Sequence, residues 1–161
     1  MRLSVSTALS CEADVVAFVH RVRPRYAEVD AQGVVFNAHW LTYFDEACTR
    51  WFDAMGFAPA EAFFRDFDVM LVKAVLEWQG PAGFDDVVDV AVECPRVGTK
   101  SFDVRYTATV GGRGACVGTI TYVSVQPGTH DSTAIPTTLR RALETDAGVS
   151  GPPGAPSPPA R

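Results

Sequence analysis

Apolar and polar residues follow two different periods along this chain, and the change between periods marks the predicted elements. Residues 38–55 repeat apolar side chains at helical spacing, with charged and threonine side chains mostly on the opposite side. Asn37 suits the N-cap of this helix, and Gly56 suits its C-terminal stop. Because the apolar stripe is wide and includes Trp40 and Trp51, we expect other elements to wrap the helix.

One strand-like run precedes this helix and four follow it. The runs cover residues 17–25, 69–78, 87–94, 101–110 and 115–125. The glycine-rich segment 111–114 predicts a hairpin turn between the last two. Short helices are expected at residues 59–65 and 136–144. The order of strand, long helix and four strands predicts an α+β domain, with the helix across the concave face of an antiparallel sheet.

The length of 161 residues fits one domain with a sizeable core. We predict an N-terminal arm at residues 1–15, the folded domain at 16–145, and a disordered tail rich in proline and glycine at 146–161.

A net charge of -5 without a basic run argues against nucleic acid as the partner. No apolar run approaches the ~20 residues that span a bilayer. The four cysteines are far apart in the sequence, which favours free thiols in a reducing compartment over disulfides or a metal site. Since the N-terminus also lacks the pattern of a signal peptide, we expect a cytoplasmic protein.

The most informative stretch, residues 26–40, links the first strand to the long helix. Asp30 lies three residues before Gly33, which permits a tight turn, and the chain reaches the helix start at Asn37. A carboxylate can serve as general base or nucleophile, and backbone N–H groups at a helix start can stabilise an oxyanion. The same aspartate could instead only cap its own turn.

Three segments of the chain carry a family resemblance. They read Arg23-x-Arg25-Tyr26-x-Glu28-x-Asp30-x-x-Gly33-Val34-Val35-Phe36-Asn37 leading into Tyr43-Phe44-Asp45-Glu46-Ala47, then Gly80-Pro81-Ala82-x-Phe84-Asp85-Asp86, then Arg96-Val97-Gly98-x-Lys100-Ser101-Phe102. In this order, over roughly residues 19–143, they resemble the 4-hydroxybenzoyl-CoA thioesterase-like family of hotdog-fold acyl-CoA thioesterases. The resemblance implies a five-stranded antiparallel sheet wrapped around one long central helix.

The resemblance also implies an acyl-CoA thioesterase that releases a free carboxylic acid and coenzyme A without a metal or bound cofactor. Asp30 would be the nucleophile or the base for water, and the backbone N–H of Asn37 would polarise the thioester carbonyl. The resemblance implies a homodimer or homotetramer as well, with active sites at the dimer interface, and an uncovered sheet edge would favour the same pairing. The predicted substrate-binding residues are Gly33, Val34, Phe36, Ala38, His39, Trp40, Arg96, Lys100 and Ser101, the last three for coenzyme A.

Asn37 stands where members of one branch of the family carry histidine, which leaves more of the proton transfer to Asp30. Asp45 and Glu46 match the catalytic acid of another branch, but they fall on the polar side of the helix, where solvent or subunit contact is expected. Two other functions stay open. One is a hotdog hydratase or dehydratase, which would need His39 paired with an acid. The other is a non-catalytic acyl-CoA-binding module.

Several further residues are interpreted as structural. Glu28 is expected to pair with a neighbouring arginine, and Cys48 is expected to be a buried, unreactive thiol. The aromatic residues predicted in the core are Trp40, Trp51, Phe52 and Trp78, and those predicted at a pocket wall are Phe36, Trp40, Phe63 and Phe64. The pattern does not select among aromatic, short and medium acyl groups.

Overall fold

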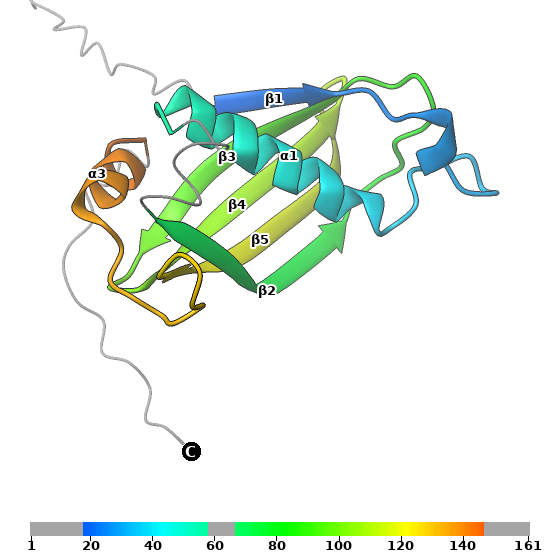
Figure 1. Cartoon of the computed structure of the whole chain (residues 1–161). Helices are drawn as coiled ribbons and strands as arrows, with labels where there is room; N and C mark the ends of the chain where they lie inside the picture. Colours follow the sequence, from blue (N-terminus) through cyan, green and yellow to red (C-terminus); the bar gives the residue numbers. More distant parts are fainter. Residues whose placement is uncertain (1–17, 58–66, 147–161) are drawn as a thin grey trace, which may run out of the picture.

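A five-stranded antiparallel sheet curves around one long helix in the computed structural model of the chain, which describes residues 18–57 and 67–146 (Figure 1). Across the sheet the strands stand in the order β1 (Phe18–Val22), β3 (Val88–Val97), β4 (Ser101–Val110), β5 (Arg113–Val125) and β2 (Asp68–Trp78). The long helix is α1 (His39–Ala54), with η1 (Tyr26–Glu28), a 3-10 turn, before it and α3 (Thr137–Asp146) near the C-terminal end. This arrangement confirms the predicted α+β hotdog architecture.

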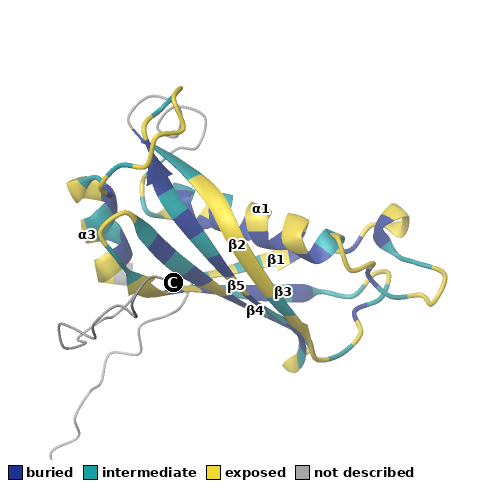
Figure 2. Cartoon of the chain, turned by 90° about the horizontal axis from the view of Figure 1, so that it is seen from below, coloured by how far each residue is buried: buried dark blue, intermediate teal, exposed yellow. Residues whose placement is uncertain are grey.

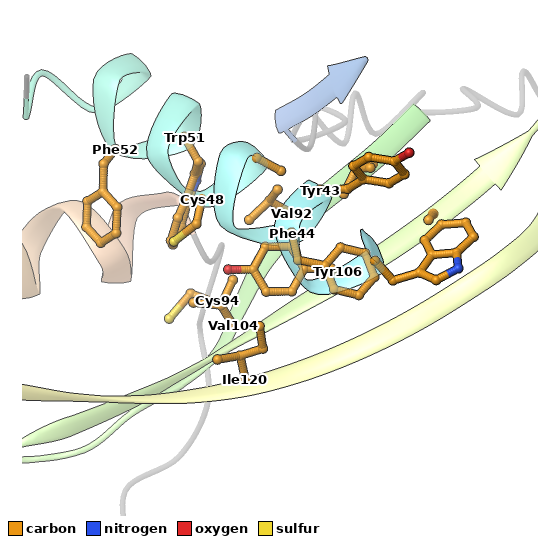
Figure 3. Close-up of a cluster of buried hydrophobic side chains, with 14 of the residues drawn as sticks. Tyr43, Phe44, Cys48, Trp51, Phe52, Val92, Cys94, Val104, Tyr106 and Ile120 are labelled. Atoms are coloured by element: carbon orange, nitrogen blue, oxygen red, sulfur yellow. The ribbon is translucent and has the colours of Figure 1, made fainter. Parts of the chain in front are cut away.

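The apolar stripe of α1 packs against the sheet as its periodicity predicts. Its buried members are Trp40, Tyr43, Phe44, Ala47, Cys48, Trp51 and Phe52. The ring of Phe44 stacks on Tyr106 of β4, with centroids 4.9 Å apart and planes 14° apart (Figure 3). Beneath it lies Gly118 of β5, where a Cβ atom would come within 2.5 Å of the Phe44 ring. The helix therefore lies so close to the sheet that only glycine fits at this contact.

The sequence pattern of β4 and its turn is confirmed. Phe102, Val104 and Tyr106 alternate on the buried face of β4 as predicted. Gly111 and Gly112 connect β4 to β5 with φ values of 56° and 80°. A two-residue turn with both φ positive matches the right-handed twist of its strands, and glycine adopts it without steric cost.

The second strand forms close to its predicted residues, but its exposure differs from the prediction that Trp78 lies in the core. It is apolar in sequence, but β2 forms the edge of the sheet next to β5, and most of its residues are exposed (Figure 2). Trp78, predicted in the core, is 53% exposed, whereas Trp40, Trp51 and Phe52 are buried as predicted. The core prediction for Trp78 is wrong because hydrophobicity alone cannot show that a strand has a neighbour on one side only.

Other boundaries shift for local reasons. β1 ends at Val22, three residues before the predicted limit, because Pro24 has no N–H to donate to a ladder. β3 instead continues past Pro95 to Val97, through a register shift between Glu93 and Arg96 that accommodates the proline. The predicted arm, the helix at 59–65, Phe63, Phe64 and the tail beyond residue 146 lie outside the described residues. None of the described helices is long and apolar enough to cross a membrane.

Candidate functional site

The bend at Asp30–Gly33 is closed by its own backbone. Gly33 N–H donates to the Asp30 carbonyl (2.9 Å), and Asp30 N–H donates to the Val34 carbonyl (2.9 Å). Gly33 has a φ of 79°, which favours glycine at this position. The Asp30 carboxylate accepts a hydrogen bond from Gln32 N–H at 2.8 Å through Oδ1, so the aspartate does cap its own turn. Its second oxygen, Oδ2, has no hydrogen-bond partner among the described residues.

A short ladder fixes this bend beside the start of α1. Val29 pairs with Val35 in an antiparallel bridge, and Phe36 N–H donates to the Glu28 carbonyl at 2.9 Å. On the other side, Val35 N–H donates to the Ala82 carbonyl at 2.8 Å. The Asp30 bend and the helix entrance, residues 36–38 just before α1, therefore belong to one hydrogen-bonded unit.

The amide end of α1 begins one residue later than predicted. Ala38 is the N-cap, with helical φ and ψ and no side-chain cap, so the prediction of Asn37 as N-cap is wrong. His39 N–H donates to the Phe36 carbonyl at 2.9 Å. The N–H groups of Asn37 and Ala38 donate to no group in the part of the chain that the structure describes. Such groups at a helix start carry partial positive charge and can stabilise an oxyanion.

A cavity of about 470 Å³ lies between this helix start, the bend and the end of β2. The described residues that line it are Gln32, Val34, Val35, Asn37, Trp40, Trp78, Gln79, Gly80, Pro81 and Ala82. Their side chains are apolar or neutral amides, and none of them is charged. Arg113 donates to the Pro81 carbonyl at 3.0 Å and so supports the wall that follows β2. The cavity suits an uncharged group with one polar function.

The structure brings only part of the predicted site to this cavity. Val34, Asn37 and Trp40 line it. The other predicted residues near the helix start are not among the described residues that line the cavity; they are Asp30, Gly33, Phe36, Ala38 and His39. Phe36 is 51% exposed, and its ring packs edge-on against His39 with centroids 6.3 Å apart. Asp30 itself does not line the cavity, but Gln32 and Val34, which belong to the same bend, do.

The residues predicted to bind coenzyme A lie at the other end of the sheet within one chain. Trp78 is in register with Val90 across β5 and β4, and Val97 is seven residues further along β3, roughly 20 Å away. There Arg96 pairs with Asp103 through two nitrogens, at 2.5 and 2.9 Å. Ser101 Oγ accepts from Arg96 at 3.3 Å, and Lys100 donates to Ser132 at 3.2 Å. Within one chain these three residues lie away from the cavity, and their role in binding coenzyme A stays a prediction.

One feature next to the site was not predicted from the sequence, and a second was predicted only in part. Trp78, Gln79 and Pro81 line the cavity, whereas the Gly80-Pro81-Ala82 segment stands out in the sequence only for its family resemblance. The second feature is a buried network at Glu28: its pairing with an arginine, Arg25, confirms the expectation, whereas its burial and its hydrogen bond to Tyr43 were not expected. Strand order and side-chain burial, neither of them local in sequence, decide both features.

The Glu28 side chain is 4% exposed, accepts three hydrogen bonds and forms an ion pair with Arg25. Oε2 accepts from the Arg25 backbone N–H at 2.8 Å and from the Tyr43 hydroxyl at 2.7 Å. Oε1 accepts from Arg25 Nε at 2.7 Å, and the ion pair brings Arg25 Nη2 to 2.5 Å from the same oxygen. Burial by itself would raise the pKa of this carboxyl, but these bonds and the guanidinium charge outweigh it and lower the pKa to about 2. Burial and the Glu28 bond raise the pKa of Tyr43.

Three other side chains considered from the sequence, Cys48, Asp45 and Glu46, lie as expected. Burial raises the pKa of the Cys48 thiol to about 11, which agrees with its expected lack of reactivity. Asp45 and Glu46 are exposed on α1, as expected for its polar side. Among the described residues, no cluster of three or more histidine, cysteine, aspartate or glutamate side chains could hold a metal ion.

Comparison with known proteins shows a family match and one sequence relative. The sequence model of the thioesterase-like superfamily matches residues 22–143. A protein of Aquifex aeolicus (strain VF5) that is provisionally named an esterase is 29% identical over 89 residues, which cover 55% of this chain and 70% of that protein.

Solved structures show the same fold. A gentisyl-coenzyme A thioesterase is 25% identical, with a TM-score of 0.72 over 78% of this chain and 99% of its own. A thioesterase of Thermus thermophilus, complexed with coenzyme A and zinc, is 22% identical, with a TM-score of 0.72 over 81% of this chain and 94% of its own. The second likeness supports the fold alone.

Proposed function

Because the chain belongs to the thioesterase-like superfamily, we propose that it hydrolyses the thioester of an acyl-coenzyme A, as the 4-hydroxybenzoyl-CoA thioesterase-like enzymes do. One observation carries this proposal: the bend that holds Asp30 and the free amide end of α1 form adjoining walls of a single uncharged cavity. The similarity to a gentisyl-coenzyme A thioesterase supports the same substrate class.

The chemistry follows from these two walls. Asp30, or a water molecule that it deprotonates, attacks the thioester carbonyl carbon, and the carbonyl oxygen becomes an oxyanion. The N–H groups of Asn37 and Ala38 stabilise that charge, a contribution typically worth about 3 kcal/mol per donor. When the intermediate collapses, the C–S bond breaks and coenzyme A leaves as a thiolate that takes up a proton. If Asp30 is the nucleophile, water then hydrolyses the resulting anhydride.

Asp30→Asn tests this function while preserving the bend. The asparagine side-chain oxygen can still accept the hydrogen bond from Gln32 N–H, so the fold should persist while the base or nucleophile is lost. With a panel of aromatic, short-chain and medium-chain acyl-CoA thioesters, we expect kcat to fall by roughly three orders of magnitude or more. Asp45→Asn, on the exposed side of α1, is the matched control and should keep wild-type kcat.

Four outcomes would contradict the proposal. Full turnover by a folded Asp30→Asn protein would show that this carboxylate only caps its turn. Loss of turnover in Asp45→Asn would move the catalytic acid to the helix. Hydration of an enoyl-CoA without thioester hydrolysis would favour the hydratase alternative, and binding without any turnover would favour the non-catalytic module.

We also propose that two copies pair through the β2 edge. This strand has 11 residues and no partner on its outer side among the described strands. Its exposed large apolar side chains are Met70, Leu71, Val72, Val75 and Trp78. Antiparallel pairing with a second β2 would satisfy the edge and cover these side chains. Val72→Lys should then shift the protein toward monomer in sedimentation velocity; an unchanged sedimentation coefficient would refute this interface.

The same pairing bears on coenzyme A. In an antiparallel pair, the start of one β2 lies beside the end of the other, so the 97–101 turn of one copy lies on the same side as the cavity of its partner. The prediction that Arg96, Lys100 and Ser101 bind coenzyme A therefore requires the dimer. We expect Lys100→Ala to raise KM without lowering kcat; an unchanged KM would remove Lys100 from the binding site.

A further inference from the structure

Among the described residues, Glu28 is the one charged residue that is buried. Its three hydrogen bonds use both carboxylate oxygens, and two of them come from Arg25, which lies only three residues earlier and also forms an ion pair with Glu28. The third, from Tyr43, joins it to a residue 15 positions later on α1. A buried carboxylate is costly without such partners, so the network constrains all three residues.

The position of Glu28 links the two walls of the candidate site. It lies two residues before Asp30, and its backbone carbonyl accepts from Phe36 N–H at the helix entrance. Tyr43 is 2% exposed on the second turn of α1, with its ring 5.9 Å from that of Trp40, a cavity residue. Glu28 therefore contacts the segment before α1 through its backbone and α1 itself through its side chain.

We propose that Glu28 and Tyr43 are positioning residues for thioester hydrolysis: their hydrogen bond holds the Asp30 bend in register with the amide end of α1. The inference rests on the proposed function and adds to it two residues that touch no substrate. A displacement of about 1 Å between a catalytic group and its target can cost about 100-fold in rate, so such a hydrogen bond can matter without contributing to chemistry.

Tyr43→Phe removes the hydroxyl and keeps the ring that packs on Trp40. We expect kcat to fall about 10- to 100-fold while KM stays within about threefold, because ground-state binding in the cavity is retained. Tyr122→Phe is the matched control, since it removes another buried hydroxyl, which contacts that of Tyr106 at 3.1 Å on β4 and β5. This control should lose stability without a change in kcat.

Amide hydrogen exchange gives a second result that does not depend on turnover. The N–H groups of Asp30 and Gly33, which close the bend, should exchange several-fold faster in Tyr43→Phe than in wild type, but not in Tyr122→Phe. Equal kcat in wild type and Tyr43→Phe would overturn the positioning role. Equal effects of the two tyrosine variants on kcat and on amide exchange would overturn it as well, and neither result would touch the proposed function. No turnover in the wild type would instead refute the proposed function and, with it, the role of this bond in catalysis.

Discussion

Acidification should selectively remove the stabilisation that the buried Glu28 carboxylate provides. In the folded chain its hydrogen bonds lower its pKa from the ordinary 4.5 to about 2, whereas the unfolded chain has no such network. A depressed carboxyl pKa means that the unfolded state binds the proton first. The contribution is therefore complete above about pH 4.5 and is lost as the pH falls from there toward 2.

The magnitude follows from the same two values. A tenfold change in an equilibrium constant corresponds to about 1.4 kcal/mol, so the difference between 4.5 and about 2 amounts to roughly 3 kcal/mol. Glu28 is 3% exposed, so solvent screens this contribution little. For a domain whose total stability is about 5–15 kcal/mol, this is a substantial fraction.

The assay compares wild type and Glu28→Gln by guanidinium unfolding between pH 2.5 and 7, at one fixed protein concentration so that association does not alter the result. The difference in free energy of unfolding should be largest near neutral pH and shrink steadily below pH 4.5. Glu93→Gln, at an exposed glutamate 3.5 Å from Arg105, is the control and should show a small difference at every pH. A Glu28→Gln difference that does not vary with pH would refute the argument.

Three further predictions concern packing and accessibility. Gly118→Ala should destabilise the fold by about 1–3 kcal/mol, because its Cβ atom would overlap the buried ring of Phe44. Gly114→Ala is the control: its new Cβ atom meets only the flexible, exposed side chain of Gln79, so the thermal midpoint should change little. Arg140→Ala removes a 2.5 Å hydrogen bond to a carbonyl of the β3–β4 turn, so amide exchange should accelerate in that turn, and unchanged exchange would contradict it. Iodoacetamide at pH 8 should leave Cys48 unmodified in the native protein and alkylate it after unfolding, as measured by peptide mass spectrometry; native alkylation would show that burial does not protect the thiol.

Much of the architecture could be predicted because its causes are local in sequence. The helical spacing of apolar residues in α1, the strict alternation in β4 and the paired glycines at Gly111 and Gly112 each specify one geometry without reference to the rest of the chain. The Asp30 bend was found for the same reason, since an aspartate three residues before a glycine with positive φ can close its own turn.

The candidate site was only partly predictable, because most of its walls come from distant segments. Trp78 is an apolar residue in an apolar run, and only the strand order, which leaves β2 at the edge, makes it a cavity wall. Asn37 follows the loop as expected, but the helix begins one residue later than its side chain suggests. Arg96 and Lys100 lie at the far end of the sheet, a fact that depends on strand direction.

The elements, their order and the tight bend that carries the carboxylate follow from the amino-acid sequence alone, since periodicity and turn chemistry act over a few residues. Three features depend instead on the folded chain: Glu28 is buried against Tyr43, the bend adjoins the amide end of α1, and one apolar strand is left at an edge. Each of these depends on contacts between residues far apart in the chain, and no local pattern specifies which surfaces such contacts bring together.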